Sequence, residues 1–439
     1  MIHRNQQDAP INALFLWTFV INIVIPKAGI KFAGIPLTIG NVMIGLLLVY
    51  SLLIGDVGRR KLTRPFLFFA LGCCFWIARF TAAYAGGSSL SEFIGYLVPL
   101  CIYPAAYFLT PLYVTTRPQI RRLARILFWC LLFLFGYTLL QAAFGIGAVD
   151  IPGITVNYSD YAENPSAWWL EKSNAVGDAS KMVSTYQNGN LFGVTIILLF
   201  PIALSSERRL PVKVIFWALF ILSVLLAGSR TVYLGLMLLA AYYIVRSLAH
   251  MRFKVGTLAA LVATMLAAVV LLAVVVTNFA PDMFDRVLSI FDLETLLQGA
   301  GRTGGAIEYF TWLLQHPAAL LFGGFGMDYE GFAYEMTYIC VFLLGGMFGF
   351  ALFMAFLITA LKEALKGLSR GDALARALFI SLVVYWITAF VEGGYWLPPI
   401  AWNVWAIAGI ARCYCTVFLK GTALPAAVGN INSRAYAFN

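Results

Sequence analysis

Residues 211–247 read PVKVIFWALFILSVLLAGSRTVYLGLMLLAAYYIVRS, an apolar stretch with one turn signal near its middle. A helix needs ~20 apolar residues to cross a bilayer, so this stretch predicts two crossing helices. Gly228-Ser229-Arg230 is the natural turn between them. About twelve apolar stretches of this length, including the two in this hairpin, are spread along the whole chain. We predict spans at residues 11–29, 34–54, 65–85, 92–113, 125–147, 189–205, 211–228, 231–247, 256–278, 333–361, 374–392 and 398–418.

The composition agrees with this pattern. Hydrophobic residues make up 61% of the chain and charged residues 11%, with a mean hydropathy of +0.85. A soluble domain cannot bury so much apolar surface, whereas helices that face lipid need it. We therefore predict an all-α polytopic integral membrane protein, with residues 1–439 forming one transmembrane domain. The net charge of +10 fits basic loops facing anionic membrane lipids, so we expect no nucleic-acid partner.

The cysteines and histidines predict no special chemistry. All seven cysteines fall within apolar segments, which favours packing over a disulfide framework or a metal site. The three histidines have no clustered partners, so a zinc site or a serine–histidine triad has no support, and we expect no metal and no cofactor. No small-residue cleavage site follows a short apolar core at the N-terminus, so we expect no removed signal peptide. The cysteines are Cys73, Cys74, Cys101, Cys130, Cys340, Cys413 and Cys415.

Basic residues gather in alternate short loops, an arrangement that the positive-inside rule gives to the cytoplasmic side. With twelve spans, all of these loops and both termini fall on one side. We therefore predict cytoplasmic termini. The basic loops lie at residues 59–64, 117–125, 208–213, 246–254 and 362–376.

The opposite side then carries two long polar segments, residues 148–188 and 279–332, which are rich in acidic and aromatic residues. Loops longer than ~15 residues inside a compact protein are usually functional or disordered. The amphipathic pattern at residues 307–314 predicts a short helix at the membrane interface within the second loop. We predict that the working face of the protein is this outer side.

Arg230 and Arg302 lie at or beyond the outer face, where basic residues work against the insertion rule. Arg230 could serve as an interfacial anchor, and Arg302 as a solvated surface residue. Two guanidinium groups would instead suit a diphosphate, because each binds phosphate oxygens through two hydrogen bonds and stays charged. For the pair together we favour the second interpretation.

Two further charged residues lie at the outer membrane boundary. Arg79 falls near the outer end of the third span, where a charge is costly and marks a functional candidate. A structural pairing of Arg79 with Glu92 is an equal alternative. Glu392, in the sequence FVEGGYW, serves a site or caps a helix end, and both roles stay open.

Four short motifs occur in order along residues 185–360. They are TYQNGNLFG at 185–193, GSR at 228–230, the segment from Arg302 through YFTWLLQHP to LFGGFG at 321–326, and GGMFG at 345–349. The set resembles the O-antigen polymerase and ligase superfamily. The resemblance implies a GT-C-like glycosyltransferase of the bacterial inner membrane, with two long periplasmic loops containing short helices. It also implies a polyprenyl-diphosphate-linked glycan as donor and a polyprenyl-diphosphate-linked repeat unit as acceptor.

One departure from the family pattern is informative. Ligases of the superfamily carry a histidine just before the helix that follows the large loop, and Glu335 stands at that position here. The resemblance therefore favours a polymerase that makes O-antigen or exopolysaccharide. Arg230 and Arg302 would stabilise the leaving diphosphate, and Glu335 would take the proton of the attacking hydroxyl. A solvated glutamate at a helix start is the alternative for Glu335.

Further expectations complete this hypothesis. A chain-length-regulating membrane protein would be a partner of a polymerase. Two other functions stay open: a ligase that transfers glycan to a lipid A core, and a polytopic transporter of lipid-linked glycans. The lack of an internal repeat and the confinement of both long loops to one face disfavour transport. We expect substrate contacts from Arg79, Asn190, Trp312, Tyr338 and Glu392.

Overall fold

The computed structural model describes residues 10–32, 35–54, 63–165, 181–250, 302–324, 336–392, 394–396 and 398–418, and these are predominantly helical. The predicted span at 256–278 lies outside the described residues. Two 3-10 turns, η5 (Leu368–Arg370) and η6 (Gly394–Trp396), precede the last two helices. Helices at the other predicted spans include α1 (Ala13–Val24), α2 (Ile39–Ile54), α3 (Arg64–Ala85), α6 (Arg117–Phe144), α10 (Gly189–Ser206), α11 (Leu210–Ala227), α12 (Arg230–His250), α18 (Thr337–Leu365), α19 (Ala373–Thr388) and α20 (Pro398–Phe418).

The predicted span at 92–113 is a run of short helical pieces. Pro99 and Pro104 lack the N–H group that a continuous helix needs, so the hydrogen-bond pattern changes at both positions. The run begins with a reciprocal capping box between Ser89 and Glu92. Its pieces are α4 (Leu90–Leu97), η2 (Val98–Ile102), η3 (Tyr103–Ala105) and α5 (Ala106–Tyr113).

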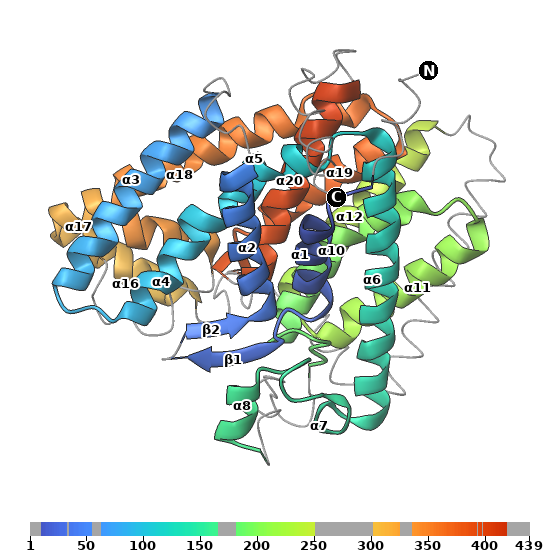
Figure 1. The fold of residues 1–439 in the computed structure, drawn as a ribbon, viewed down its shortest axis with the longest axis horizontal. Coiled ribbons are helices and arrows are strands. Elements are labelled where there is room, and N and C mark those ends of the chain that lie inside the picture. The colour runs from blue at the N-terminus through green and yellow to red at the C-terminus, as the bar shows by residue number, and fades with distance from the viewer. Residues whose placement is uncertain are drawn as a thin grey trace, which may run out of the picture.

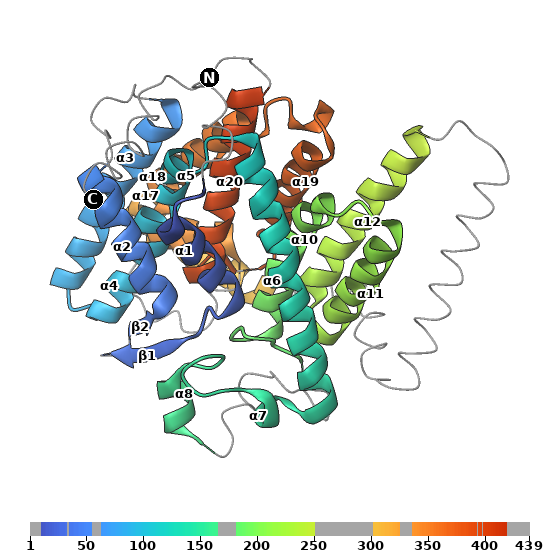
Figure 2. The same ribbon diagram turned by 45° about the vertical axis from the view of Figure 1, so that its right-hand side comes forward.

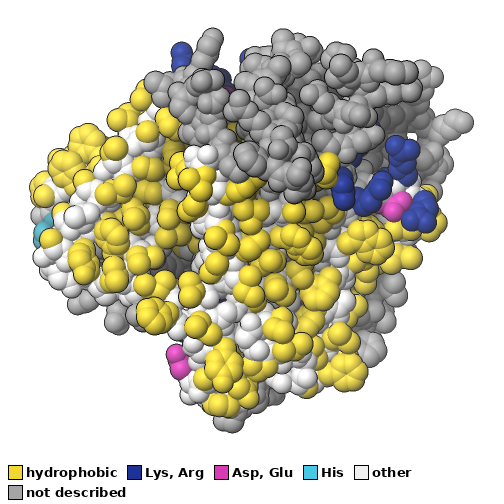
Figure 3. Space-filling model, viewed as in Figure 1, with side chains coloured by type: hydrophobic (Ala, Val, Ile, Leu, Met, Phe, Trp, Pro, Cys, Tyr) yellow, Lys and Arg dark blue, Asp and Glu magenta, His cyan; other side chains and the backbone are white. Residues whose placement is uncertain are grey.

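Within the described part of the chain, six helical segments are long and apolar enough to cross a membrane: α3, the α4–α5 run, α6, α10, α11 and α18. Figure 3 shows one face of the molecule covered mostly by hydrophobic side chains, with basic side chains gathered near its upper right edge. An apolar surface of this extent is favourable against lipid and unfavourable in water. The helices thus fit a membrane-embedded protein.

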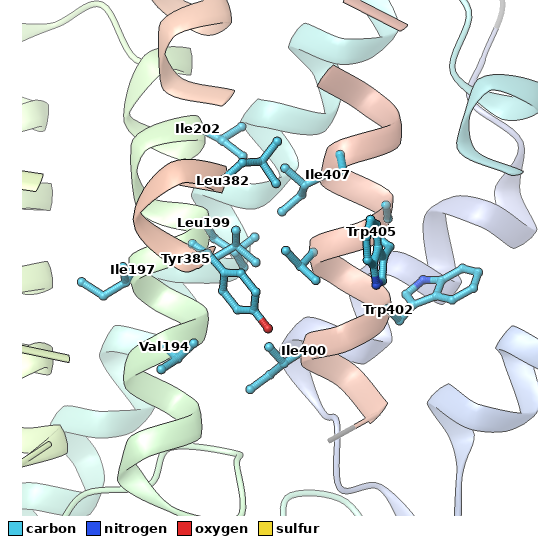
Figure 4. Packing of buried hydrophobic residues seen from close by; sticks show 14 of the residues in the cluster. Val194, Ile197, Leu199, Ile202, Leu382, Tyr385, Ile400, Trp402, Trp405 and Ile407 are labelled. Carbon is cyan, nitrogen blue, oxygen red and sulfur yellow. The ribbon is translucent and has the colours of Figure 1, made fainter. Parts of the chain in front are cut away.

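The centre of the bundle is formed by α10, α19 and α20. Figures 1 and 2 show α11 and α12 on one side of this centre, and α3, α4, α16 and α17 on the other. Nearly all of α10 is buried, as a helix that is apolar on every side should be. Trp402 and Trp405 of α20 are fully buried, and Figure 4 shows them on the side of α20 opposite to α10 and α19.

Two short antiparallel strands, β1 (Gly29–Phe32) and β2 (Ile35–Thr38), join α1 to α2. The all-α prediction holds for the bulk of the chain but misses this hairpin, and the predicted spans 11–29 and 34–54 run into it. The hairpin lies against α8 (Tyr158–Glu163), which with α7 (Ile146–Val149) follows α6 (Figure 1). The strands and α8 together form a small layer at one end of the helices.

The predicted second outer loop is described in part, as α16 (Arg302–Gln315) and α17 (Pro317–Phe322). The predicted helix at 307–314 lies within α16. The end of α17 meets α18 at Gly346, where α18 is broken by a φ of 58° and a ψ of −158°. A Cβ at Gly346 would lie 2.5 Å from the carbonyl carbon of Leu321, so this approach requires glycine.

Candidate functional site

The starts of α10 and α12 lie side by side at one end of the bundle. The N–H of Met182 donates to the carbonyl of Leu226 at 2.9 Å, which ties the segment before α10 to the end of α11. A Cβ at Gly189 would lie 2.3 Å from the carbonyl oxygen of Ala227. The motifs TYQNGNLFG and GSR, distant in sequence, are therefore neighbours in space. We define this helix-start junction as residues 181–193 and 226–232.

Small residues continue the close approach along both helices. A Cβ at Gly193 of α10 would lie 2.2 Å from Cγ2 of Val232, and a Cβ at Gly235 of α12 would lie 3.1 Å from Cγ2 of Ile197. Glycines of this kind let two helix backbones pack closely in a membrane. The packing holds the first turns of α10 and α12 at the same end of the bundle.

Arg230 is the first residue of α12, and its side chain is exposed. Gly228 ends α11 in the left-handed conformation, with φ 60° and ψ 28°, which reverses the chain within two residues. The free N–H groups of a helix start carry partial positive charge. The junction therefore combines two helix starts with one guanidinium group, an arrangement that favours an anion.

Two asparagines occupy the start of α10. Asn188 caps the helix, because its Oδ1 accepts from the N–H of Leu191 at 3.0 Å. Asn190, a predicted substrate-binding residue, is half-buried in the first turn. Its Oδ1 is shielded from solvent and has no hydrogen-bond partner among the described residues. This amide oxygen can accept a hydrogen bond from a ligand or a water molecule.

A lysine cluster that we did not predict lies beside the junction. Lys27 Nζ donates to Oε1 of Gln187 at 2.7 Å, and Lys31 forms an ion pair with Asp160 at 2.6 Å. Gln187 immediately precedes the start of α10, so the hairpin and α8 reach the junction. The sequence carried a signal, because Lys27 and Lys31 lie where the first two predicted spans meet, on the side predicted to be opposite the basic loops.

Tyr338 and Glu392 lie near the same end of the bundle. Thr337 Oγ1 donates to the carbonyl of Glu392 at 3.0 Å, and Tyr338 Oη donates to the carbonyl of Trp386 at 3.1 Å. These bonds join the start of α18 to the end of α19. Glu392 is only 7% exposed, so its side chain is buried at this end of the bundle. A Cβ at Gly394 would lie 3.7 Å from Leu191, so this region also contacts α10.

Arg79 lies on the other side of the bundle and holds α17. Its Nε and Nη2 donate to the carbonyls of Phe322 and Gly323 at 2.9 and 2.8 Å. Carbonyls at a helix end lack partners within the helix, so the guanidinium acts as a cap. Glu92, the alternative partner, instead accepts from the N–H of Ser89 at 3.0 Å. These contacts favour a structural role for Arg79 over the predicted substrate contact.

Trp312 lies in the last turn of α16, just before α17. Its ring stacks on His316 with centroids 4.2 Å apart and an interplanar angle of 19°. Trp312 therefore shares the neighbourhood of α17 with Arg79. Arg302 begins α16, but its side chain lies outside the described residues, as does the whole of Glu335.

Metal coordination has no candidate group in the described ranges: no three His, Cys, Asp or Glu side chains lie close enough together to hold an ion. No family model, curated protein or solved structure matches this chain. The functional assignment therefore depends on the residues and their geometry.

Proposed function

We propose that the protein is a glycosyltransferase that polymerises polyprenyl-diphosphate-linked oligosaccharide repeats into O-antigen or exopolysaccharide. The growing lipid-linked chain is the donor, and a single lipid-linked repeat is the acceptor. The reaction needs no metal in this scheme, because protein cations stabilise the leaving diphosphate. The protein crosses the bacterial inner membrane about twelve times, with both termini in the cytoplasm and the active face in the periplasm.

The helix-start junction is the observation that carries this proposal. A diphosphate needs fixed positive charge and backbone close enough to approach its oxygens. The junction offers Arg230 at the start of α12 beside the start of α10. Both helices are apolar beyond their first turns, which suits a ligand whose phosphate head lies at the membrane boundary while its prenyl tail remains in lipid.

The chemistry can be written for the proposed residues. The acceptor sugar hydroxyl attacks the anomeric carbon of the donor, and the bond from that carbon to the diphosphate oxygen breaks. The diphosphate leaves with the bonding electrons, and Arg230 and Arg302 stabilise its charge. Glu335 takes the proton of the attacking hydroxyl. Near the junction, the substrates are contacted by Asn190, Tyr338 and Glu392. Trp312, which lies on α16, contacts the glycan.

A reconstitution assay tests the proposal. Purified protein in liposomes is given one synthetic polyprenyl-diphosphate-linked repeat unit, and the products are separated by size. A polymerase yields a ladder of lipid-linked products. A requirement for added lipid A core would indicate a ligase, and movement of the lipid across the bilayer without new bonds would indicate a transporter. Either of these two results would overturn the proposal.

A further inference from the structure

The β1–β2 hairpin has one apolar face and one polar face. Side chains alternate between the two faces of a strand, and residues opposite each other in an antiparallel pair share a face. The register pairs Ile30 with Leu37 and Phe32 with Ile35. These four apolar side chains therefore lie on one face, which we call the hairpin face, and Lys31 lies on the other.

The two faces differ in what they contact. Lys31 forms its ion pair with Asp160 of α8, and Figures 1 and 2 show the hairpin between the end of α2 and α8. The opposite face is open, because 72% of Phe32, 48% of Leu37 and 45% of Ile30 is exposed. Large apolar side chains gathered at such exposure are unfavourable in water and mark an interaction surface.

The exposed side chains of α2 continue the hairpin face. β2 runs directly into α2, and no charged residue occurs in the sequence between Phe32 and Leu53. Exposed apolar residues follow α2 at intervals of three and four, which places them along one side of the helix. Such a stripe along an apolar helix is covered favourably by lipid. Its residues are Ile39, Val42, Leu46, Val49 and Leu53.

Both outer edges of the hairpin carry hydrogen bonds to other elements. A strand at the edge of a sheet presents N–H and C=O groups that are costly in lipid unless they are bonded. On β1, the N–H of Lys31 donates to Oγ of Ser159 at 2.9 Å. On β2, the side-chain amide of Asn41 donates to the carbonyl of Pro36 at 3.0 Å, and Pro36 has no N–H group of its own. These edges suit a location with little water.

We propose that the hairpin face inserts into the lipid leaflet at this end of the bundle, among the acyl chains just below the headgroups. Membrane lipid is the occupant because the hairpin face continues the stripe of α2, which lies along a membrane-embedded helix. The polar face, with Lys31 and Asp160, then lies towards the headgroups and water. This inference stands independently of the proposed function.

The insertion has a consequence for the helix-start junction. Lys27, two residues before β1, donates to Oε1 of Gln187 in the junction at 2.7 Å. The hairpin and the junction are therefore tied together at the same end of the bundle. A hairpin anchored below the headgroups would hold the junction at headgroup level, where the phosphates of a lipid-linked molecule lie.

Photocrosslinking in a bilayer tests the insertion. The full chain is reconstituted into vesicles of phosphatidylethanolamine and phosphatidylglycerol, with the photoreactive amino acid p-benzoyl-phenylalanine placed at Phe32. The same amino acid at Leu46 of α2 is the lipid-facing reference, and at Glu163, an exposed residue of α8, it is the matched control. After illumination, mass spectrometry identifies what each position has bonded. Lipid adducts should form at Phe32 and Leu46 but not at Glu163.

Each other result contradicts the proposal. Adducts at Leu46 without any at Phe32 would place the hairpin face in water. A protein adduct at Phe32 would make the hairpin face a contact with a second copy or another protein. No adduct at Leu46 would remove the lipid-facing stripe, and equal adducts at all three positions would remove the difference between the two faces.

Hydrogen exchange in the same vesicles gives a second test. Phe32→Leu keeps the hairpin face apolar, so residues 29–38 should exchange at the wild-type rate. Phe32→Glu carries a charge that favours water, so exchange should accelerate roughly tenfold, the value of a partly buried aromatic side chain. Unchanged exchange in Phe32→Glu would overturn the insertion. A lipid adduct at Phe32 in a protein that makes no ladder would keep the insertion and overturn the polymerase.

Discussion

The two ends of α18, α19 and α20 differ in how their polar groups are used. At one end, Asp372 caps α19, pairs with Arg117 and accepts from Tyr414 at 2.6 Å. Glu363 at the same end pairs with Arg412 at 3.3 Å. At the other end lie the exposed Arg230 and the half-buried Asn190. Among the described residues, the charged groups at the first end pair with one another and form a closed end, whereas at the second, open end the buried Oδ1 of Asn190 has no hydrogen-bond partner.

The pKa directions at the first end agree with a structural network. Burial alone would raise the pKa of Asp372, but hydrogen bonds from Tyr414, the N–H of Ala375 and Arg117 lower it below its usual value. The backbone N–H groups of Arg209 and Arg208 lower the pKa of Glu207 to about 2. These carboxylates stay ionised and bound at neutral pH.

The largest expected effect is that of Glu335→Gln. Glutamine keeps the shape of the side chain but cannot take a proton, so polymer formation should fall ~10²–10⁴-fold. Single lipid-linked repeats should accumulate, as measured by the ladder assay. Near-normal ladders would mean that another residue is the general base, and Glu392 and Glu330 would be the next candidates. Glu335→His should recover part of the activity if this position does the same work in ligases.

Arg230→Lys and Arg302→Lys should each lower the polymerisation rate ~10²–10³-fold, because lysine keeps the charge but loses the two-point contact with phosphate. Arg209→Lys is the matched control, since Arg209 is an exposed arginine at the closed end, with 77% of its side chain accessible. The control should polymerise at the wild-type rate. If Arg230→Lys polymerises at the wild-type rate, Arg230 serves only as a membrane anchor.

Gly193→Ala should destabilise the protein by about 1–3 kcal/mol, because its Cβ would lie 2.2 Å from Val232 and separate α10 from α12. Thermal unfolding measures the change. Gly136→Ala is the control, since Gly136 lies in α6 with nothing within 4 Å of the added Cβ. The control should be neutral or stabilised by up to ~1 kcal/mol. Equal behaviour of the two variants would contradict the close packing of the junction.

The smallest effect is that of Asp372→Asn at the closed end. The carboxylate is about a third exposed, so solvent screening limits its loss to below ~1 kcal/mol. Because the folded pKa is lowered, this stability is present above the unfolded pKa of ~3.9 and is lost as pH falls through the folded pKa. The difference in unfolding temperature between wild type and variant should therefore shrink below about pH 4. A constant difference down to pH 2 would contradict the ion pair.

Much of the helical architecture could be predicted because hydropathy and turn signals are local. Gly228-Ser229-Arg230 ends one helix and begins the next, as its residues indicate. The β1–β2 hairpin was missed because its short strands continue the apolar pattern of the neighbouring spans.

The site was harder to predict because it depends on contacts between distant segments. The partners of Arg79 are backbone carbonyls 243 and 244 residues away, which carry no side-chain signal. The close approach of Gly189 to the carbonyl of Ala227 is also a backbone contact, and it likewise carries no side-chain signal.

The sidedness of the two ends tests the central claim most directly. Reporter fusions at Lys172 and Asp292, in the two long polar segments, should report periplasmic exposure. A fusion at Arg370, at the closed end, should report cytoplasmic exposure. That pattern would put the helix-start junction on the periplasmic face, where lipid-linked repeats are to be joined. A cytoplasmic signal from either long segment would contradict both the orientation and the proposed reaction.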